Sequence, residues 1–404
     1  MSKMNRGIGS VPTNKLSRML LAAATGLVVA LPTTTMAQER QSADERAAEL
    51  ERVYVVGPKA ARQLQCRINW QTTVDPRGGQ SLGIEIDDQN VYAVAMGNRL
   101  TRLDRGDGKS IWTNTVADAF DKIWGITASR VTTDNGSGFT PDPEKLYITT
   151  DPVVMEIDYA TGGVVGRQEL ERVPSTRVLR FNQYLVFGTY SGQIVWHQYE
   201  VGQAWRANQL KGPIKGAPIL VDGENVSAAS LGGTIVTLGG KTARRIWADK
   251  FFDGTSTPLS YGNGVVVAAS HDQYLWAFDS GNGDVLWRYF TESPLRTPPT
   301  VIDDMVMQWV PTEGMVCLDL KPTDEVEARV RWTIKGLEGE CLGKFGENIA
   351  FFDHQTRTLH LVNASQGAVA KSVALPQVQS IQVVDGQMYV VGSGGRVERL
   401  DPIG

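Results

Sequence analysis

The side chains most often used as metal ligands, nucleophiles or proton carriers are few and scattered. They are His197, His271, His354, His360, Cys66, Cys317 and Cys341. Only His354 and His360 lie within ten residues of each other, whereas a metal site needs three or four ligands that converge. We interpret the cysteines as small buried apolar residues, with one Cys317–Cys341 bridge as the alternative. The sequence therefore predicts no metal site, no cofactor and no catalytic residue.

Aspartates recur in a fixed pattern and are the next candidates for chemistry. In the clearest unit, Asp279 is followed four residues later by Gly283, and Gly283 four residues later by Trp287. A carboxylate just before a Gly turn can accept backbone N–H bonds and fix that turn. Because the pattern repeats, we predict a structural and not a catalytic role for the members Asp104, Asp158, Asp279 and Asp319.

Tryptophans follow the same pattern. Six lie at the repeat-fixed position and are predicted to be structural: Trp70, Trp112, Trp205, Trp247, Trp287 and Trp332. The other four, Trp124, Trp196, Trp276 and Trp309, are out of register. An out-of-register aromatic side chain can line a rim or a central funnel, so one of these four is a candidate for a binding surface.

The pattern has a period of about 40 residues, which is the length of four short strands with their turns. Its anchor positions are Asp104, Asp158, His197, Leu238, Asp279, Asp319, Asn363 and Asp401. Apolar runs such as 265–269 do not alternate, as expected for strands covered on both faces. The 42 Gly and 18 Pro have no collagen-like period, which suits many short strands and turns. The sequence therefore predicts an all-β fold, an eight-bladed β-propeller.

The eighth unit lacks an outer strand, because only three residues follow Asp401. Leu64 to Thr73 has the phase of an outer strand: Trp70 precedes its anchor Asp104 by 34 residues, close to the spacing elsewhere. We predict that this N-terminal strand completes the last blade and closes the ring, which would remove two exposed sheet edges.

Three segments are expected along the chain. Residues 1–37 have the pattern of a signal peptide, with four basic residues, an apolar run over 19–31 and small residues before cleavage near Ala37. The charge of residues 38–63 indicates a short helix or tail outside the ring. Residues 64–404 are expected to form the propeller. The apolar run is short for a membrane span and no Cys follows it directly, so we expect a soluble periplasmic or secreted monomer; a retained anchor is the alternative. Without the signal the chain has 36 basic and 44 acidic residues, a net charge of −8 that argues against nucleic acid as a partner.

One unit is longer than the others. The interval from Asp104 to Asp158 contains an insertion of about 13 residues between Trp112 and Tyr147. Its order of acidic residues does not match an EF-hand, so no Ca²⁺ site is expected. Long loops in compact domains are often functional, and we predict a partner-binding rim there, with a loop that binds nothing as the alternative. The candidate residues are Trp124, Phe139, Pro141 and Pro143.

The repeated Asp279, Gly283 and Trp287 unit resembles the tryptophan-docking repeat of PQQ-like β-propellers, and the repeats cover about 340 of the 404 residues. The resemblance implies eight blades held by Trp side chains that dock on the next blade. The family includes quinone-dependent dehydrogenases, which carry adjacent cysteines that this chain lacks, and non-enzymatic exported propellers such as BamB. The nearest resemblance, to BamB-like propellers, implies a non-catalytic scaffold that binds an envelope protein or peptide. A small-molecule or glycan-binding propeller and a PQQ-dependent dehydrogenase are the alternatives.

Overall fold

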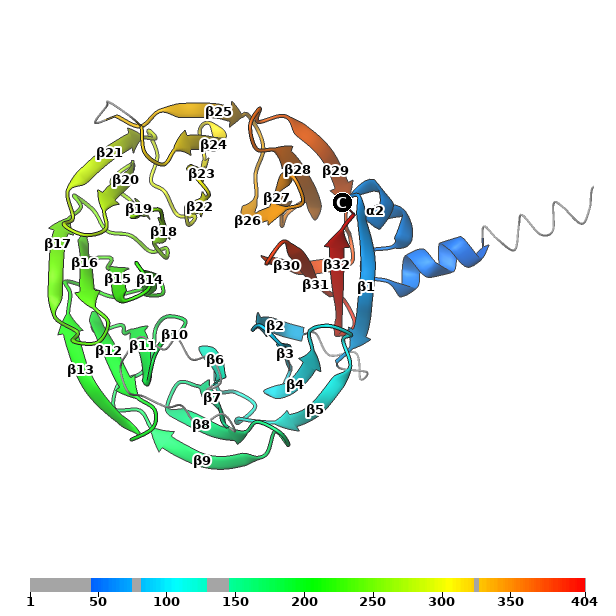
Figure 1. The fold of residues 1–404 in the computed structure, drawn as a ribbon, viewed down its shortest axis with the longest axis horizontal. Coiled ribbons are helices and arrows are strands. Elements are labelled where there is room, and N and C mark those ends of the chain that lie inside the picture. Colours follow the sequence, from blue (N-terminus) through cyan, green and yellow to red (C-terminus); the bar gives the residue numbers. More distant parts are fainter. Residues whose placement is uncertain (1–44, 75–80, 129–144, 323–326, 404) are drawn as a thin grey trace, which may run out of the picture. The chain divides into compact units, whose positions relative to one another are not determined.

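The computed structural model describes residues 45–74, 81–128, 145–322 and 327–403. The chain divides into two units, Met1–Ala47 and Ala48–Gly404, and the second contains all the strands. Eight antiparallel sheets of four strands each form a ring, as Figure 1 shows. The predicted eight-bladed β-propeller is confirmed.

Each blade is a meander whose strands follow one another in the chain. We number the blades from 1 to 8 and give the innermost strand first. Blades 1 to 4 are β2(Ser81–Ile86), β3(Asn90–Ala95), β4(Arg99–Asp104), β5(Ser110–Thr115); β6(Gly125–Ala128), β7(Lys145–Thr149), β8(Val153–Asp158), β9(Val164–Glu169); β10(Leu179–Phe181), β11(Tyr184–Gly188), β12(Gln193–Gln198), β13(Gln203–Gln209); and β14(Ile219–Val221), β15(Asn225–Ala229), β16(Thr234–Gly239), β17(Arg245–Lys250).

Blades 5 to 8 repeat the same order, except that the last strand of blade 8 comes from the beginning of the chain. These blades are β18(Ser260–Gly262), β19(Val265–Ala269), β20(Tyr274–Asp279), β21(Val285–Phe290); β22(Thr300–Ile302), β23(Met305–Val310), β24(Gly314–Asp319), β25(Val330–Ile334); β26(Glu340–Phe345), β27(Asn348–Asp353), β28(Thr358–Asn363), β29(Val369–Ala374); and β30(Val378–Val384), β31(Gln387–Gly392), β32(Arg396–Pro402), β1(Cys66–Thr73).

The core of the ring lies between the blades. The buried apolar residues form eight clusters among the described residues, and each cluster joins two neighbouring blades; Val265, Trp287 and Val316, for example, join blades 5 and 6. All five residues of β19 are buried, so the non-alternating apolar run reflects a strand covered on both faces.

The ring closes as predicted. Strand β1 pairs antiparallel with β32, with Trp70 opposite Arg399 and Thr73 opposite Arg396. The strand begins at Cys66, because Leu64 ends a short preceding helix, α2(Pro58–Gln63). Blade 8 thus receives its outer strand from a segment more than 300 residues away in the chain, and neither edge of the ring is left open there.

The segment before β1 packs more closely than we predicted. Val55, Val56 and Leu64 are at most 3% exposed and join the apolar cluster between blades 7 and 8. The carboxylate of Glu398, itself fully buried, accepts hydrogen bonds from the backbone N–H groups of Val55 (2.8 Å) and Val56 (3.1 Å). Residues 58–63 form a short helix, which was one of the two predicted forms, but residues 55–64 pack against the ring and do not lie apart from it.

Candidate functional site

The recurring aspartates lie at the turn between the third and fourth strands of their blades. Asp104 Oδ1 accepts hydrogen bonds from the N–H groups of Gly106 and Asp107, and Asp279 Oδ1 makes the equivalent bonds. At Asp158 the hydroxyl and N–H of Thr161 lower the pKa of the carboxyl. Asp319 differs, because its carboxylate pairs with Arg331 and Arg329. All four side chains thus hold local structure.

Five of the six repeat-fixed tryptophans bridge neighbouring blades in one way. Each indole N–H donates to the backbone carbonyl of the residue that follows the anchor position in the next blade, at 2.8–3.0 Å. The pairs are Trp70 with Arg105, Trp112 with Tyr159, Trp247 with Ser280, Trp287 with Leu320 and Trp332 with Ala364. These bonds connect blades in the way that the resemblance implied.

Trp205 is the exception. Its side chain is 37% exposed and its ring stacks on Tyr184 of the same blade, with 5.0 Å between the ring centroids. Trp196, from the neighbouring strand β12, is fully buried and donates its indole N–H to the carbonyl of Gly240 in blade 4. An out-of-register tryptophan therefore fills the position that the sequence pattern assigned to Trp205.

Two anchor positions are also shifted by one residue. Tyr184 pairs with Gln198 and Asn225 pairs with Gly239, as Val265 pairs with the anchor Asp279. The anchors of blades 3 and 4 are therefore Gln198 and Gly239, not His197 and Leu238. Neither unit has an Asp at this turn, so the sequence lacked the residue type that fixes the register elsewhere.

The predicted rim site is only partly described. Trp124 is 8% exposed, donates its indole N–H to Asp151 Oδ1 at 2.6 Å and lies under the Lys122 ammonium group. Phe139, Pro141 and Pro143 lie outside the described residues. The Trp124 ring is thus committed to contacts within its own blade, and the rest of that site stays a prediction.

The cysteines and histidines do not converge on one site: Cys317 and Cys341 share an apolar cluster, whereas Cys66 lies in another. The three thiols are free, so the alternative Cys317–Cys341 bridge is wrong, and burial raises the pKa of each to about 12. A thiol with such a pKa is a poor nucleophile at neutral pH. Burial lowers the pKa of His197 to about 4. Within the described ranges, no group of three His, Cys, Asp or Glu side chains could hold a metal ion.

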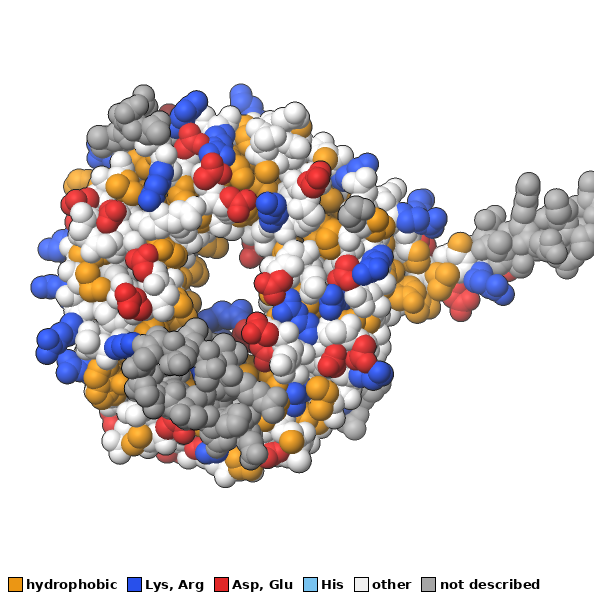
Figure 2. All heavy atoms as spheres, in the orientation of Figure 1, with side chains coloured by type: hydrophobic (Ala, Val, Ile, Leu, Met, Phe, Trp, Pro, Cys, Tyr) orange, Lys and Arg blue, Asp and Glu red, His pale blue; other side chains and the backbone are white. Residues whose placement is uncertain are grey.

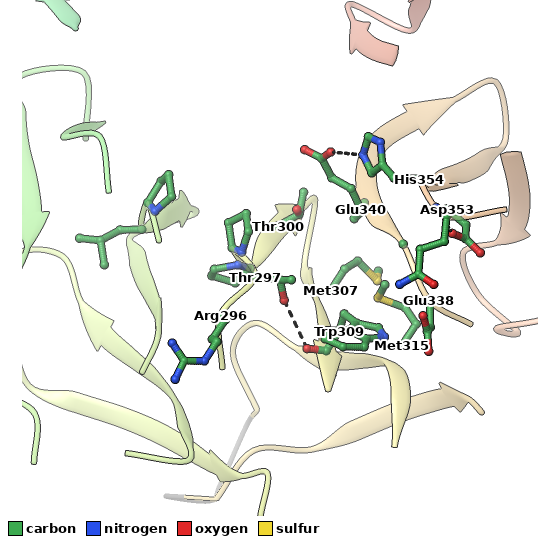
Figure 3. A pocket seen from close by; sticks show the side chains of 17 residues that line it. Arg296, Thr297, Thr300, Met307, Trp309, Met315, Glu338, Glu340, Asp353 and His354 are labelled. Carbon is green, nitrogen blue, oxygen red and sulfur yellow. Dashed lines mark hydrogen bonds and ion pairs between the residues drawn. The ribbon is translucent and has the colours of Figure 1, made fainter. Parts of the chain in front are cut away.

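A cleft of about 600 Å³ opens between blades 5, 6 and 7 (Figure 3). Its residues come from the connections β17–β18, β21–β22 and β25–β26, from the turn after β27, and from the adjoining ends of β23 and β24. Since successive strands of a blade run in opposite directions, these connections share one rim. The ends of β6 and β7 that flank the predicted insertion lie on the opposite rim.

The floor of the cleft is apolar. Met307 and Met315 are each 1% exposed and Leu259 is 5% exposed, and Figure 3 shows the two Met side chains beside Trp309. Trp309 is half-buried, and its indole N–H makes no hydrogen bond with any described residue, whereas its carbonyl accepts one from Thr297. Methionine and tryptophan together form an adaptable surface for an apolar ligand, with one polar group available for orientation.

The walls of the cleft carry more acidic than basic groups. Glu338, Glu340 and Asp353 line it, against one guanidinium, that of Arg296. His354 Nε2 lies 3.1 Å from Glu340 Oε2. Burial raises the pKa of Asp353, but hydrogen bonds from Thr356 and Gln355 outweigh it, and the net pKa is lowered. The cleft is therefore apolar at its floor and negative along the side formed by blade 7.

Sequence reasoning named only part of this site. Trp309 is one of the four tryptophans outside the repeat register, and that position was the one sequence feature that pointed to this cleft. The other lining residues are spread along the chain from Pro258 to Gln355, so no local spacing brings them together. The charged side chains elsewhere are mixed: Figure 2 shows acidic and basic side chains interspersed on the visible face of the ring.

Comparisons with known proteins agree with this fold. Residues 150–321 match a family model described as outer membrane protein assembly factor BamB. The structure is similar to the crystal structure of BamB from Moraxella catarrhalis, with a TM-score of 0.64 and 17% identity over 83% of this chain and 97% of that one. It is also similar to the computationally designed protein Ika8, with a TM-score of 0.59 and 13% identity over 80% and 96% of the two chains.

No curated protein matches the chain in sequence. No helix in the described part of the chain is long and apolar enough to span a bilayer. The matched segment covers parts of blades 2 to 6, and the strands and tryptophan contacts continue around the rest of the ring. Residues 150–321 match the BamB family model, and the ring that contains them is a β-propeller of eight blades with the fold of BamB.

Proposed function

We propose that this protein is a non-catalytic interaction scaffold of the cell envelope, BamB-like in its role, which binds an envelope protein or peptide. The family model and the propeller fold support this role, because a propeller offers rims and clefts for recognition while its blades are used in packing one another. The mature chain is proposed to be periplasmic or secreted, after loss of residues 1–37.

The observation that carries the proposal is the cleft between blades 5, 6 and 7. Met307 and Met315 lie buried beneath this cleft, and the apolar surface that opens into it comes from the half-buried Trp309 and the exposed Pro258 and Pro298. An exposed apolar depression with a polar edge is typical of an interaction site. The recurring Asp and Trp side chains, by contrast, are used to hold turns and blades together.

A small molecule or glycan is the second candidate ligand. A volume of about 600 Å³ lies within the range of small-molecule sites, about 300–1,000 Å³. The predicted insertion rim, with Phe139, Pro141 and Pro143, stays a separate proposal for the partner site. Its test is to shorten residues 134–142 to a Gly-Ser turn and to compare the captured partners.

The decisive experiment is affinity capture of the mature protein from a detergent extract of the envelope, followed by identification of what is retained. The same preparation is incubated with pyrroloquinoline quinone, Ca²⁺ and a redox dye, and applied to a polysaccharide column. A scaffold should retain specific envelope proteins, leave the dye unbleached and pass through the column. Dye reduction that requires the quinone would contradict the non-catalytic role.

A further inference from the structure

We propose that the cleft between blades 5, 6 and 7 receives an extended peptide segment of the partner, in which an apolar side chain lies close to a Lys or Arg. This rests on the proposed scaffold function and specifies the chemistry of its partner. The apolar side chain would pack against the half-buried ring of Trp309 and the exposed Pro258 and Pro298. The basic side chain would face the carboxylates of blade 7.

The first argument is the charge of the blade 7 wall. Glu338 is exposed and forms no ion pair with a described residue, and the one ion-pair partner of Glu340 among the described residues is the exposed His354. A third carboxyl group, Asp353, has a lowered pKa and so stays ionised at neutral pH. Three carboxylates beside an apolar floor favour a cationic ligand, and they disfavour a phosphorylated or acidic one.

The second argument is the length of the recessed surface. A further hollow of about 200 Å³ adjoins the cleft and shares Trp309 and Glu338 with it. It continues the depression past Pro311 to Lys335, whereas the other end of the main cleft reaches Pro258 in the connection to blade 5. A surface that crosses the connections of three blades suits an extended chain better than a compact ligand.

The third argument is the polar groups that the fold leaves available. Eight of the ten Trp side chains donate their indole N–H to a described residue, and Trp309 and Trp205 do not. Arg296, on the wall opposite Glu338, likewise makes no ion pair with a described residue. The Trp309 N–H and the Arg296 guanidinium are donors that could bind the carbonyl oxygens of a peptide backbone.

The test uses fluorescein-labelled nonapeptides in a Gly-Ser background that carry one Leu and one Arg separated by zero to three Ser residues. Binding to the mature protein is measured by fluorescence anisotropy at low and high salt. We expect at least one spacing to bind, with affinity that falls about tenfold when Leu becomes Ser and about fivefold when Arg becomes Glu. The Arg contribution should decrease at high salt.

Matched variants assign the binding to the cleft. Glu338→Lys should weaken the Leu-Arg peptide and favour the Leu-Glu peptide, whereas Glu347→Lys, the same charge change at an exposed turn on the opposite rim, should do neither. Trp309→Ala should weaken binding about tenfold, and Trp205→Ala, at the other tryptophan with an unbonded N–H, should leave it unchanged. Thermal melting of each variant shows that it is folded.

Equal binding of the Arg and Glu peptides, no binding at any spacing, or equal effects of Glu338→Lys and Glu347→Lys would overturn the proposed peptide chemistry. The scaffold function has a different test, because envelope proteins that are captured in a Trp309-dependent manner would still support it. If neither the peptide binding nor the Trp309-dependent capture of envelope proteins is observed, both the scaffold function and the proposed peptide chemistry are rejected.

Discussion

At the scale of single residues, the contact between a tryptophan and a glycine explains why the repeat keeps both. Gly283 has φ of +81°, and a Cβ built on it would lie 2.6 Å from Trp247 Cδ2. The glycine is therefore required twice, once for the left-handed turn and once for the close approach of the indole ring from the preceding blade. Gly108, Gly162 and Gly367 meet Trp70, Trp112 and Trp332 in the same way.

This contact predicts a difference between two glycine substitutions. Gly283→Ala should destabilise the protein by about 2–4 kcal/mol, because it adds a steric clash to the backbone strain. Gly223→Ala has a similar φ of +72° but open space around the new Cβ, so it should cost about 1 kcal/mol. Chemical denaturation measures both, and equal costs would mean that the indole ring does not constrain the turn.

A second prediction at this scale concerns Glu398 and pH. Burial raises the pKa of its carboxyl from 4.5 to about 7, although the N–H groups of Val56 and Val55 partly oppose the shift. The folded protein thus holds this proton more tightly than the unfolded chain, so the stabilisation is complete below about pH 4.5 and is lost as the pH rises through 7. The loss should be about 3 kcal/mol.

The measurement is the difference in unfolding free energy between wild type and Glu398→Gln from pH 5 to pH 8. Glutamine cannot ionise, so wild type should lose stability relative to the variant as the pH rises. Comparing the two proteins removes the opposite contribution of His197, whose pKa is lowered to about 4 and which therefore destabilises the fold below about 6.5 in both. A difference that does not change with pH would show that Glu398 does not titrate in this range.

At the scale of the elements, the blades were predictable and their irregular members were not. Asp279, Gly283 and Trp287 defined the period, and Trp70 gave the phase of the closing strand. The predicted anchor positions were wrong by one residue in blades 3 and 4, where Gln198 and Gly239 stand in place of Asp. The contact with the next blade that was predicted for Trp205 is made by Trp196. The cleft was missed because its lining residues are spread along the chain from Pro258 to Gln355 and no motif links them.

Among the described residues, the interface between blades 2 and 3 has the smallest buried apolar cluster of the eight. The cluster has four buried members, Tyr147, Val154, Leu185 and Tyr199, and no indole N–H of a described tryptophan donates across it. Instead the amide of Gln168 donates to the carbonyl of Tyr199, the position that an indole N–H occupies at other interfaces. Fewer buried contacts predict more frequent local opening.

Hydrogen exchange followed by mass spectrometry tests this expectation. Peptides covering β9 and β11 should exchange faster than the equivalent peptides from β21 and β23, at the interface that contains Trp287. Gln168→Ala should accelerate the first pair and leave the second unchanged. If β9 and β11 are protected as strongly as β21 and β23, the ranking of the interfaces is wrong.

At the scale of the whole molecule, a closed ring leaves little surface for recognition other than its rims, its centre and its outer strands. Pairing of β1 with β32 removes the open edge of blade 8, and the repeat tryptophans form hydrogen bonds with the neighbouring blades. The cleft between blades 5, 6 and 7 and the predicted insertion are the two candidate partner sites. A scaffold should use one of them.

The most direct test is therefore affinity capture from envelope extract with four proteins side by side: wild type, Trp309→Ala, Trp205→Ala, and the chain with residues 134–142 shortened. We predict that Trp309→Ala loses the retained partner while Trp205→Ala and the shortened chain keep it, with all four showing the same melting temperature to within a few degrees. Unchanged partner yield with Trp309→Ala, together with loss in the shortened chain, would contradict the cleft and place the partner on the opposite rim.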